Sequence, residues 1–378
     1  MAHTIVTCHR LFDVVDLIET DPRVQVVFTV APSPFNHSVP QYLERRGAHV
    51  VPWSQAIREP FDLAVAAAYY GLDHLHAPLV MMAHGAGHGR LVRPTLTRGP
   101  ILEERPVYGL DAQRLTNDGA VLATALLLSH HGEREVLHRQ CPAALEVAVL
   151  AGDPCFDRLV ASLPWRPQYR QALGVSDDQE LVVVSSTWGP DGLFGNSPTL
   201  LPWIMDELVD EPFRAAALLH PAVWAAHGIR QVRAWTRDCR EAGLLLLDPA
   251  QDWRALLVAA DHLIGDHGSV TAYGAGIGRP VLHLAPTRSK VMAAGSAQQL
   301  VATTAARLEQ RQPLIPQLRT APPIDRDAVV AALTSRPGHA HQLIRRTMYR
   351  LLGLDEPGRH RGPTPVPVPR IDCSEVGQ

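Results

Sequence analysis

The chain has 378 residues, more than one hydrophobic core usually serves, so two domains of ordinary size are expected. Hydrophobic residues make up 46% and charged residues 19% of the sequence, which is a globular composition and excludes wholesale disorder. The formal net charge of −3 argues against a nucleic-acid-binding protein, which normally carries a basic excess.

The five cysteines are scattered, odd in number and without a CxxC pair. This pattern argues against a zinc ribbon or a disulfide framework and favours a reducing compartment. The segment Met1–Arg10 lacks a basic stretch followed by an apolar one and a cleavage site. No apolar run in the sequence has the length of a transmembrane segment. We therefore expect a cytoplasmic location.

Short apolar runs alternate with amphipathic stretches over residues 1–150, which predicts a parallel sheet covered by helices. The predicted strands are Thr4–Cys8, Val24–Val30, His49–Pro52, Leu63–Ala68 and Leu79–Met82. The alanine-rich run at Leu63–Ala68 fits a helix as well. Predicted helices are Leu11–Glu19 and Val39–Arg46, and Gly47 follows the second as a left-handed cap.

The same pattern restarts near residue 150. A linker is expected around Leu163–Pro167, and the predicted strands are Glu146–Leu150, Leu181–Ser185, Ala215–His220, Gly243–Leu247, His262–Gly265 and Pro280–Leu284. The expected fold class is α/β, with two Rossmann-like doubly wound domains that face across a cleft in the GT-B arrangement. Residues 1–150 would form an acceptor-side domain and residues 151–325 a nucleotide-binding domain. Residues 326–354 would pack back as a helical segment, and the Pro-, Gly- and Arg-rich residues 355–378 would form a disordered tail.

A polar turn follows the predicted strand His262–Gly265. The turn and the start of the next helical pattern contain Asp266, His267, Gly268, Ser269 and Val270. A strand, a turn and a helix N-terminus together offer backbone N–H groups and the positive end of a helix dipole, which suit a phosphate. Ligands of open α/β sheets bind at the carboxyl ends of strands, where this turn falls. The alternative is an ordinary helix cap, in which Ser269 satisfies the helix amides and nothing binds.

A glycine-rich loop follows the predicted strand Leu79–Met82. It contains His84, Gly85, Gly87, His88 and Arg90. Glycines let a backbone approach a ligand closely, and a histidine is a natural general base. The chain has 19 histidines, so a single one carries little weight. Two of them in a glycine-rich loop at the end of a strand favour a functional site.

Three weaker signals lie further along the chain. Ser186, Thr187 and Trp188 follow the predicted strand Leu181–Ser185, where hydroxyl groups can line a cleft. His220 precedes a proline at the end of another predicted strand, and a simple turn explains it equally well. The segment Gly152–Asp157 lies at the expected domain junction, where a structural hinge is the favoured interpretation.

Taken in order, these segments resemble the CDP-glycerol glycerophosphotransferase family of wall teichoic acid polymerases, and more loosely the UDP-N-acetylglucosamine 2-epimerases. The family motif His-Gly-Thr-Pro is similar to residues 84–87, and its Gly-x-Pro-x-x-Asp junction to residues 152–157. Its Pro-Thr-Trp-Arg segment is similar to residues 187–188, its His-Pro pair to residues 220–221, and its Asp-Tyr-Ser-Ser turn to residues 266–269. The resemblance covers roughly residues 80–285.

The resemblance implies in-line transfer from a nucleotide diphosphate donor to an acceptor hydroxyl, without a cofactor or a metal. His84 would be the general base, and His220 would help the Gly268–Ser269 amides to hold the diphosphate. The chain departs from the family where a lysine is missing after the first motif, with His88 or Arg90 as possible replacements. It also has Gly189 and His267 where the family has arginine and tyrosine.

These departures leave three functions open: a transferase, a nucleotide-sugar epimerase, or a non-catalytic nucleotide-binding protein on the same scaffold. The sequence shows no basic amphipathic membrane segment, so a small soluble acceptor is favoured over a growing wall polymer. The expected partners are a nucleotide-activated small molecule and the acceptor. Homodimer formation stays open.

Overall fold

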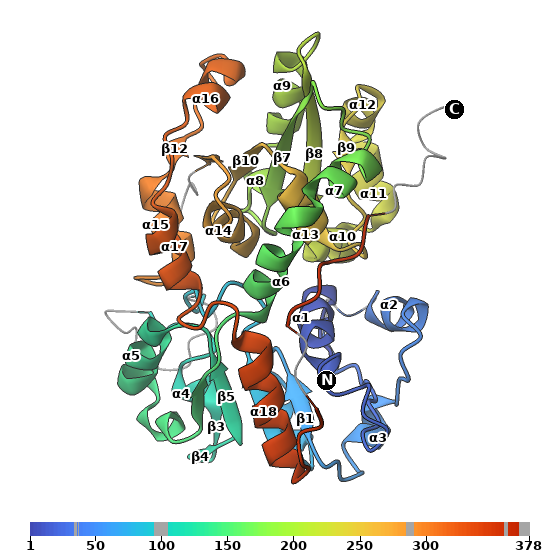
Figure 1. Ribbon diagram of the computed structural model, residues 1–378, viewed down its shortest axis with the longest axis vertical. Helices are drawn as coiled ribbons and strands as arrows, with labels where there is room; N and C mark the ends of the chain where they lie inside the picture. The colour runs from blue at the N-terminus through green and yellow to red at the C-terminus, as the bar shows by residue number, and fades with distance from the viewer. Residues whose placement is uncertain (34–35, 37, 94–104, 285–290, 359–361, 370–378) are drawn as a thin grey trace. The chain divides into compact units, whose positions relative to one another are not determined.

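The computed structural model describes residues 1–33, 36, 38–93, 105–284, 291–358 and 362–369, and Figure 1 draws them as a ribbon. The chain forms two compact units. Unit 1 comprises Met1–Asp157, Lys290–Ser296 and Ala331–Pro363. Unit 2 comprises Arg158–Ser289, Ala297–Val330 and Thr364–Gln378. The division falls after Asp157, inside helix α6 (Pro154–Ser162), and each unit takes segments from distant parts of the chain.

Unit 1 is built on a parallel sheet with the strand order β1-β2-β5-β6. A small antiparallel pair, β3-β4, lies apart from it. The elements of this unit are α1 (Ile5–Val15), α2 (Val39–Arg45), α3 (Trp53–Ala56), β1 (Ala64–Ala66), η1 (Leu72–His74), β2 (Leu79–Met82), α4 (Ala112–Leu115), β3 (Thr116–Asn117), β4 (Ala120–Val121), β5 (Ala125–Leu128), α5 (His131–Gln140), η3 (Pro142–Leu145), β6 (Ala148–Leu150) and α18 (Ala340–Leu352).

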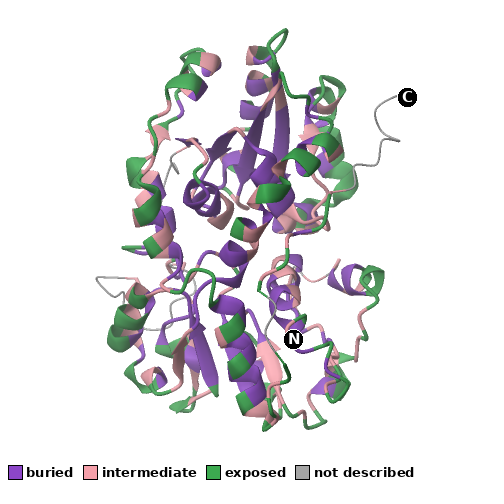
Figure 2. Ribbon diagram, viewed as in Figure 1, coloured by how far each residue is buried: buried purple, intermediate pink, exposed green. Residues whose placement is uncertain are grey.

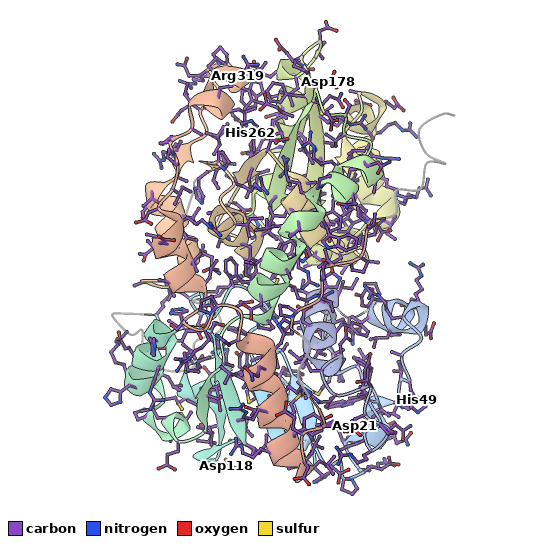
Figure 3. The ribbon with its side chains drawn as sticks, viewed as in Figure 1. Asp21, His49, Asp118, Asp178, His262 and Arg319 are labelled. Carbon is purple, nitrogen blue, oxygen red and sulfur yellow. The ribbon has the colours of Figure 1, made fainter. Side chains whose placement is uncertain are left out.

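The core of unit 1 lies around its two middle strands. Every residue of β2 and β5 is buried, as the purple strands of Figure 2 show. Helix α18 packs on this sheet through Ile344 and Met348, in one cluster with the β2 residue Val80. The Tyr349 hydroxyl donates a hydrogen bond of 2.9 Å to Asp21, which is labelled in Figure 3. The helical segment expected after residue 326 thus supplies a core helix of unit 1.

The predicted strand Thr4–Cys8 is wrong, because this segment belongs to α1. Thr4 caps the helix: its hydroxyl accepts from the N–H of Thr7, while the Thr7 hydroxyl accepts from the N–H of Thr4. Ile5 and Cys8 are buried together with Leu11, three residues apart in each step, so the apolar pattern has the period of a helix.

Two more predicted strands of unit 1 are extended but form only single bridges. Val24–Val30 has one bridge from Val30 to Ala2 and one from Phe28 to Val50 in the His49–Pro52 segment. In contrast, Leu79–Met82 is a strand with the predicted bounds, and Ala64–Ala66 lies within the predicted Leu63–Ala68. Strand β5 was not predicted, because the apolar run over residues 121–128 fits a helix as well as a strand.

Unit 2 is built on a six-stranded parallel sheet with the strand order β12-β11-β10-β7-β8-β9. Counted within the unit, this is the doubly wound order 3-2-1-4-5-6 read from the other edge. The elements are η4 (Leu163–Trp165), α7 (Arg166–Ala172), β7 (Glu180–Ser186), α8 (Leu193–Asn196), α9 (Leu200–Glu207), β8 (Phe213–Leu219), α10 (Pro221–His227), α11 (Ile229–Trp235), α12 (Arg237–Glu241), β9 (Leu245–Leu246), α13 (Trp253–Ala259), β10 (His262–Gly265), α14 (Ser269–Gly276), β11 (Val281–His283), α15 (Ala297–Thr304), β12 (Ala306–Arg307), α16 (Leu314–Thr320) and, reaching into unit 1 by sequence, α17 (Arg326–Leu333).

The α/β prediction with two Rossmann-like domains is confirmed. The five strands predicted after residue 180 all exist, with bounds shifted by at most a few residues. The prediction of a linker at Leu163–Pro167 is wrong, because η4 and the start of α7 occupy it.

The predicted disordered tail is also wrong in part. Val366 is 2% exposed, its N–H donates to the Ser162 hydroxyl, and its carbonyl accepts a bond of 2.6 Å from the Tyr169 hydroxyl. These bonds fix the extended segment on unit 2. Residues 359–361 and 370–378 lie outside the described part of the chain. Among the described helices, none combines the length and the apolar character that crossing a bilayer requires.

Candidate functional site

The candidate site of unit 2 lies at the carboxyl edge of its sheet. The sequence-predicted residues follow neighbouring strands there: Ser186 ends β7, Asp266 follows β10, and His220 follows β8. The register places Gly265 of β10 beside Ser185 of β7, so the two turns are adjacent. The strand order reverses between β7 and β10, and doubly wound sheets bind ligands at such a reversal.

Asp266 joins the two turns. The carboxylate is 2% exposed, and its Oδ2 accepts bonds of 2.8 Å from the Thr187 N–H, the Thr187 hydroxyl and the Leu193 N–H. Its Oδ1 accepts a bond of 3.0 Å from the Gly268 N–H. The Ser186 hydroxyl donates to the Thr187 carbonyl and accepts from the Phe194 N–H. The polar atoms of these three side chains therefore bond to one another and to the backbone of the loop. This role differs from the substrate contacts predicted for Asp266, Thr187 and Ser186.

Helix α14 begins at this edge without a side-chain cap. Its N-cap is Gly268, which has no side chain, so the cap that Ser269 was expected to provide as an alternative is not formed. The Ser269 hydroxyl accepts a long bond of 3.5 Å from Gln298. Val270 is the second residue of the helix and is half-buried. The first turn of α14 thus keeps the electropositive character that binds anions.

The glycines of this edge are required by contacts inside the protein. A Cβ on Gly268 would lie 2.7 Å from the Thr187 methyl group, and one on Gly265 would lie 2.2 Å from the Thr271 hydroxyl. Close packing of the β10 turn against Thr187 and against Thr271 of α14, rather than the approach of a ligand, explains these two positions.

Three other side chains border this edge. The His220 Nδ1 accepts a bond of 3.1 Å from the Ala222 N–H and caps α10, so Nε2 carries the proton. His267 Nε2 lies 3.4 Å from the Thr187 hydroxyl. Trp188 is half-buried and packs in the cluster formed by Val223 and its neighbours.

The candidate site of unit 1 is the glycine-rich loop that follows β2. His84 is an exposed residue of this loop, and its ring Nδ1 lies 3.0 Å from the Ala67 carbonyl. The carbonyl can only accept, so Nδ1 donates and the lone pair is on Nε2. Desolvation by the surrounding protein, opposed by this bond and reinforced by the charges of Arg10 and Arg90, lowers the pKa of His84 below its ordinary value. At neutral pH the ring is therefore an uncharged base.

His88 is buried in a network instead of reaching a ligand. Its Nδ1 lies 2.9 Å from Glu133 Oε1, and its Nε2 lies 2.5 Å from the Tyr69 hydroxyl. Burial raises the pKa of Glu133, but the adjacent His88 outweighs this effect and holds it at about 2. Burial raises the pKa of Tyr69 well above its ordinary value, so the phenol keeps its proton. His88 thus cannot replace the family's lysine as a phosphate ligand, since both of its ring nitrogens have internal partners.

Glu133 also determines the shape of the loop. Its Oε1 accepts from the His88 N–H at 2.5 Å, and its Oε2 accepts from the Ser129 N–H at 2.5 Å. Gly87 has a φ of +59°, and a Cβ there would lie 2.5 Å from Glu133 Oε1. Gly87 is needed for this turn, while the Arg90 side chain is exposed and remains a candidate cation.

Arg10 connects the loop with the start of α6. Its guanidinium donates to the Gly85 carbonyl at 2.8 Å and forms a buried ion pair with Asp153 at 3.2 Å. Asp157 accepts from the N–H groups of Gly338 and Ala340 at 2.7 and 2.9 Å, which anchors the start of α18. Asp153 and Asp157 of the Gly152–Asp157 segment therefore hold Arg10 and the start of α18 in place.

Four residues of the candidate sites were not predicted from the sequence: Arg10, Tyr69, Glu133 and His283. Nothing in the sequence marks Arg10, Tyr69 or Glu133, because each meets its partner only in the folded unit. His283 had a signal, since it lies near the carboxyl end of the predicted strand Pro280–Leu284 and ends β11. It is 2% exposed, desolvation lowers its pKa to about 4, and its Nε2 has no hydrogen-bond partner among the described residues. No group of three His, Cys, Asp or Glu side chains in the described ranges is arranged to hold a metal ion.

No protein-family model and no curated protein sequence matches the chain. Solved structures do match it along most of its length. A structure of the wall teichoic acid polymerase TagF has a TM-score of 0.57 at 12% identity, covering 90% of this chain and 85% of that one. S. aureus MnaA in complex with UDP has a TM-score of 0.56 at 12% identity, covering 97% and 98%. The UDP-GlcNAc 2-epimerase from Neisseria meningitidis bound to UDP-GlcNAc has a TM-score of 0.53 at 13% identity, covering 92% and 96%.

These structures come from the two groups that the sequence motifs resemble. At such low identity the likeness shows the fold alone. The chain has the GT-B-type fold of two Rossmann-like units that the polymerase TagF and the 2-epimerases share.

Proposed function

We propose that the chain is a metal-independent, cytoplasmic transferase that moves a group from a nucleotide diphosphate donor to a hydroxyl of a small acceptor. The donor would be a CDP-glycerol-like molecule or a nucleotide sugar. The observation that carries this proposal is the reversal of strand order between β7 and β10, with the uncapped helix α14 starting beside it.

Unit 2 is assigned to the donor. The diphosphate would bind the first amides of α14, where the helix dipole and the N–H groups favour negative charge. Asp266 supports this role indirectly, because its four accepted bonds hold the turn that positions those amides. The Nε2 proton of His220 would offer a further donor, which fits its predicted part in holding the diphosphate.

Unit 1 is assigned to proton removal. His84 Nε2 would accept the proton of the acceptor hydroxyl while the hydroxyl oxygen attacks the donor. Attack at the distal phosphorus of CDP-glycerol would release CMP, and attack at the anomeric carbon of a nucleotide sugar would release the nucleoside diphosphate. The amides of α14 would stabilise the charge that builds on the leaving group.

An epimerase is the second candidate. The two epimerase structures cover this chain over 92% or more of its length, and UDP or UDP-GlcNAc is bound in them. An epimerase would change the configuration of a nucleotide sugar without an acceptor, so product analysis separates it from a transferase.

The test is a thermal-shift screen of the purified protein against CDP, UDP, GDP, ADP, CDP-glycerol and UDP-GlcNAc. A ligand at about 100 times its Kd stabilises a fold by ~2.7 kcal/mol, which raises Tm by a few degrees. Preference for one nucleotide would support the donor site and direct the turnover assays. Binding without turnover of any donor would favour the non-catalytic scaffold, and a flat screen of a cooperatively folded protein would contradict the proposal.

A further inference from the structure

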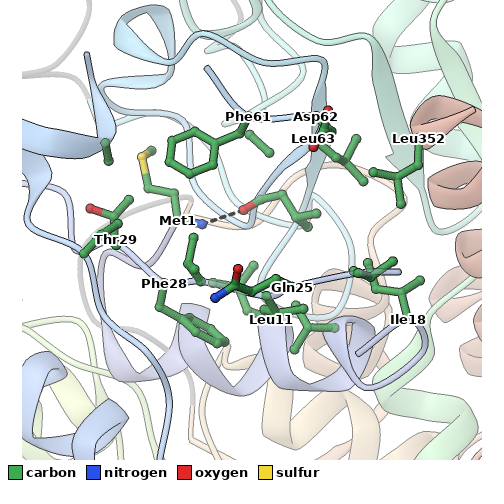
Figure 4. A pocket seen from close by; sticks show the side chains of 18 of the residues that line it. Met1, Leu11, Ile18, Gln25, Phe28, Thr29, Phe61, Asp62, Leu63 and Leu352 are labelled. Atoms are coloured by element: carbon green, nitrogen blue, oxygen red, sulfur yellow. Dashed lines mark hydrogen bonds between the residues drawn. The ribbon is translucent and has the colours of Figure 1, made fainter. Parts of the chain in front are cut away.

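Unit 1 contains a groove beside β1. Its volume is about 360 Å³. The walls of the groove are the segments Val24–Thr29 and Phe61–Val65, with α1 below them. Figure 4 shows Leu11 of α1 and Ile18, in the turn after α1, at one side of the groove and Phe61 at the other.

The first wall presents backbone groups to the groove. The backbone groups of Phe28 point away from the groove: its N–H donates to the His49 carbonyl and its carbonyl accepts from the Val51 N–H. Backbone groups of successive residues in an extended segment point to opposite sides. Thr29 therefore faces the groove, and its carbonyl accepts a bond of 2.8 Å from the Ala2 N–H. By the same alternation Val27 faces the groove too.

The second wall presents backbone groups to the groove from the opposite side. The Ala64 N–H donates to the Pro78 carbonyl in the direction of β2. Leu63 and Val65 must then face the groove, and the Val65 carbonyl accepts a bond of 2.7 Å from the Met1 amino group. Among the described residues, no backbone hydrogen bond to Val27 or Leu63 is present.

The hydrogen bonds of Met1 and Ala2 to the two walls indicate the width of the groove. Met1 bonds to one wall and Ala2 to the other, so the walls are two strand spacings apart with room for one strand between them. The bridge between Ala2 and Val30 is parallel. A strand that continues this path therefore runs parallel to both walls.

The lining suits such a strand on both of its faces. One side of the groove is lined by Leu11, Val15 and Ile18. Phe61 and Leu75 add further apolar side chains to the lining. A parallel strand covered on both faces reads as a continuous apolar run. The Thr29 hydroxyl is buried without a hydrogen-bond partner among the described residues.

The amino group of Met1 is consistent with a peptide at this position. Burial lowers its pKa to about 6, because a charge there loses its hydration. A peptide N–H in the same place would give Val65 the same hydrogen bond without a charge.

We propose that the groove receives a β-strand of about five apolar residues that leads directly into Met1 and pairs in parallel with Val24–Thr29 on one side and with Leu63–Val65 on the other. This strand joins the two walls into one sheet. It continues the order β1-β2-β5-β6 beyond β1 and covers the apolar face of α1. The inference stands apart from the proposed transferase activity.

The test compares the chain with two extended forms of it. One carries Arg-Val-Leu-Val-Val before Met1, which places the charged residue at the end of the groove near Asp62. A matched form carries Gly-Ser-Gly-Ser-Gly. We expect the apolar extension to raise Tm by about 5 °C or more and to slow amide hydrogen exchange at Val27 and Val65 by about tenfold or more. The matched form should change neither.

A third form, Arg-Val-Pro-Val-Val, keeps the apolar character but loses one ladder N–H, so the rise in Tm should largely disappear. Equal Tm and equal exchange in all the extended forms would overturn the proposal. Fluorescence of the dye ANS supplies a further readout: the apolar strand should displace it from the groove. Undiminished dye binding in that form would identify a pocket for a small apolar ligand and would also overturn the proposal.

Discussion

Asp266 and Thr187 lock the ends of β10 and β7 together, since one carboxylate oxygen accepts both the N–H and the hydroxyl of Thr187 at 2.8 Å. The contact lies at the point where the strand order of unit 2 reverses. The residues that the sequence marks as ligand-binding thus build the turn, and the backbone of the turn is left to meet a ligand.

Asp266→Asn tests this relationship. An amide has one acceptor oxygen, so its NH₂ group must face either the Gly268 N–H or the donors of Thr187 and Leu193. We expect the free energy of unfolding to fall by about 1–3 kcal/mol and nucleotide binding to weaken with it. Urea denaturation measures the first effect. The exposed Asp177→Asn is the control, and equal stability of the two variants would contradict the assigned role.

Ser269→Pro tests the amides of α14. Proline is tolerated at the first position of a helix, and Gly268 before it is extended, with φ −77° and ψ 159°. The variant should fold normally but lose one N–H donor, which weakens nucleotide binding by about 10- to 100-fold. Ser269→Ala keeps the N–H and serves as the control. Equal affinities of the two variants in calorimetry would place the phosphates elsewhere.

His84→Ala tests the general base. We expect kcat to fall by about 10²–10⁴-fold with nucleotide affinity nearly unchanged. The base must be uncharged, and the surrounding protein lowers the pKa of His84, so the acid limb of the kcat profile should lie below pH ~6.5. An ordinary histidine would give a limb near pH ~6.5. The exposed His76→Ala is the control, and a parallel loss of binding and rate would remove His84 from this role.

Gly87→Ala tests the contact between the loop of unit 1 and Glu133. Both Gly87 and Gly47 have positive φ, +59° and +68°, so alanine at either position carries a similar backbone cost of about 1–2 kcal/mol. Only at Gly87 would the Cβ also meet Glu133 Oε1, at 2.5 Å, since nothing lies within 4 Å at Gly47. Gly87→Ala should therefore destabilise the protein clearly more than Gly47→Ala in thermal unfolding. Equal losses of stability in the two variants would mean that the Glu133 side chain moves aside without destabilising the fold.

Glu133→Gln tests the buried network through pH. The pKa of Glu133 is about 2 in the folded chain, below its ordinary value, because the adjacent His88 outweighs the opposing effect of burial. The carboxylate therefore contributes stability above pH ~4.5 that is lost as the pH falls towards 2, on the order of 1–3 kcal/mol. Unfolding free energies measured across this range should decline less steeply for the variant. Parallel curves would show that Glu133 is not held ionised by the fold.

The sequence by itself determined the class of the fold and the strand edges where the candidate sites lie. Continuous apolar strands such as Leu181–Ser185 are recognisable because they are buried on both faces, and polar turns after them mark the carboxyl edge. The motif order also pointed to the groups of structures that share the fold.

Only the tertiary structure decided what individual side chains do. The sequence predicted His88 as a cation for a phosphate, but its ring nitrogens contact Glu133 and Tyr69. It predicted Thr187 as a ligand-binding residue, but the Thr187 hydroxyl donates to Asp266. Thr4–Cys8 reads as a strand by composition, yet a reciprocal cap and the burial of Leu11 make it helical. Hydrogen-bond partners far apart in the chain carry no local sequence pattern, because chain folding rather than spacing brings them together.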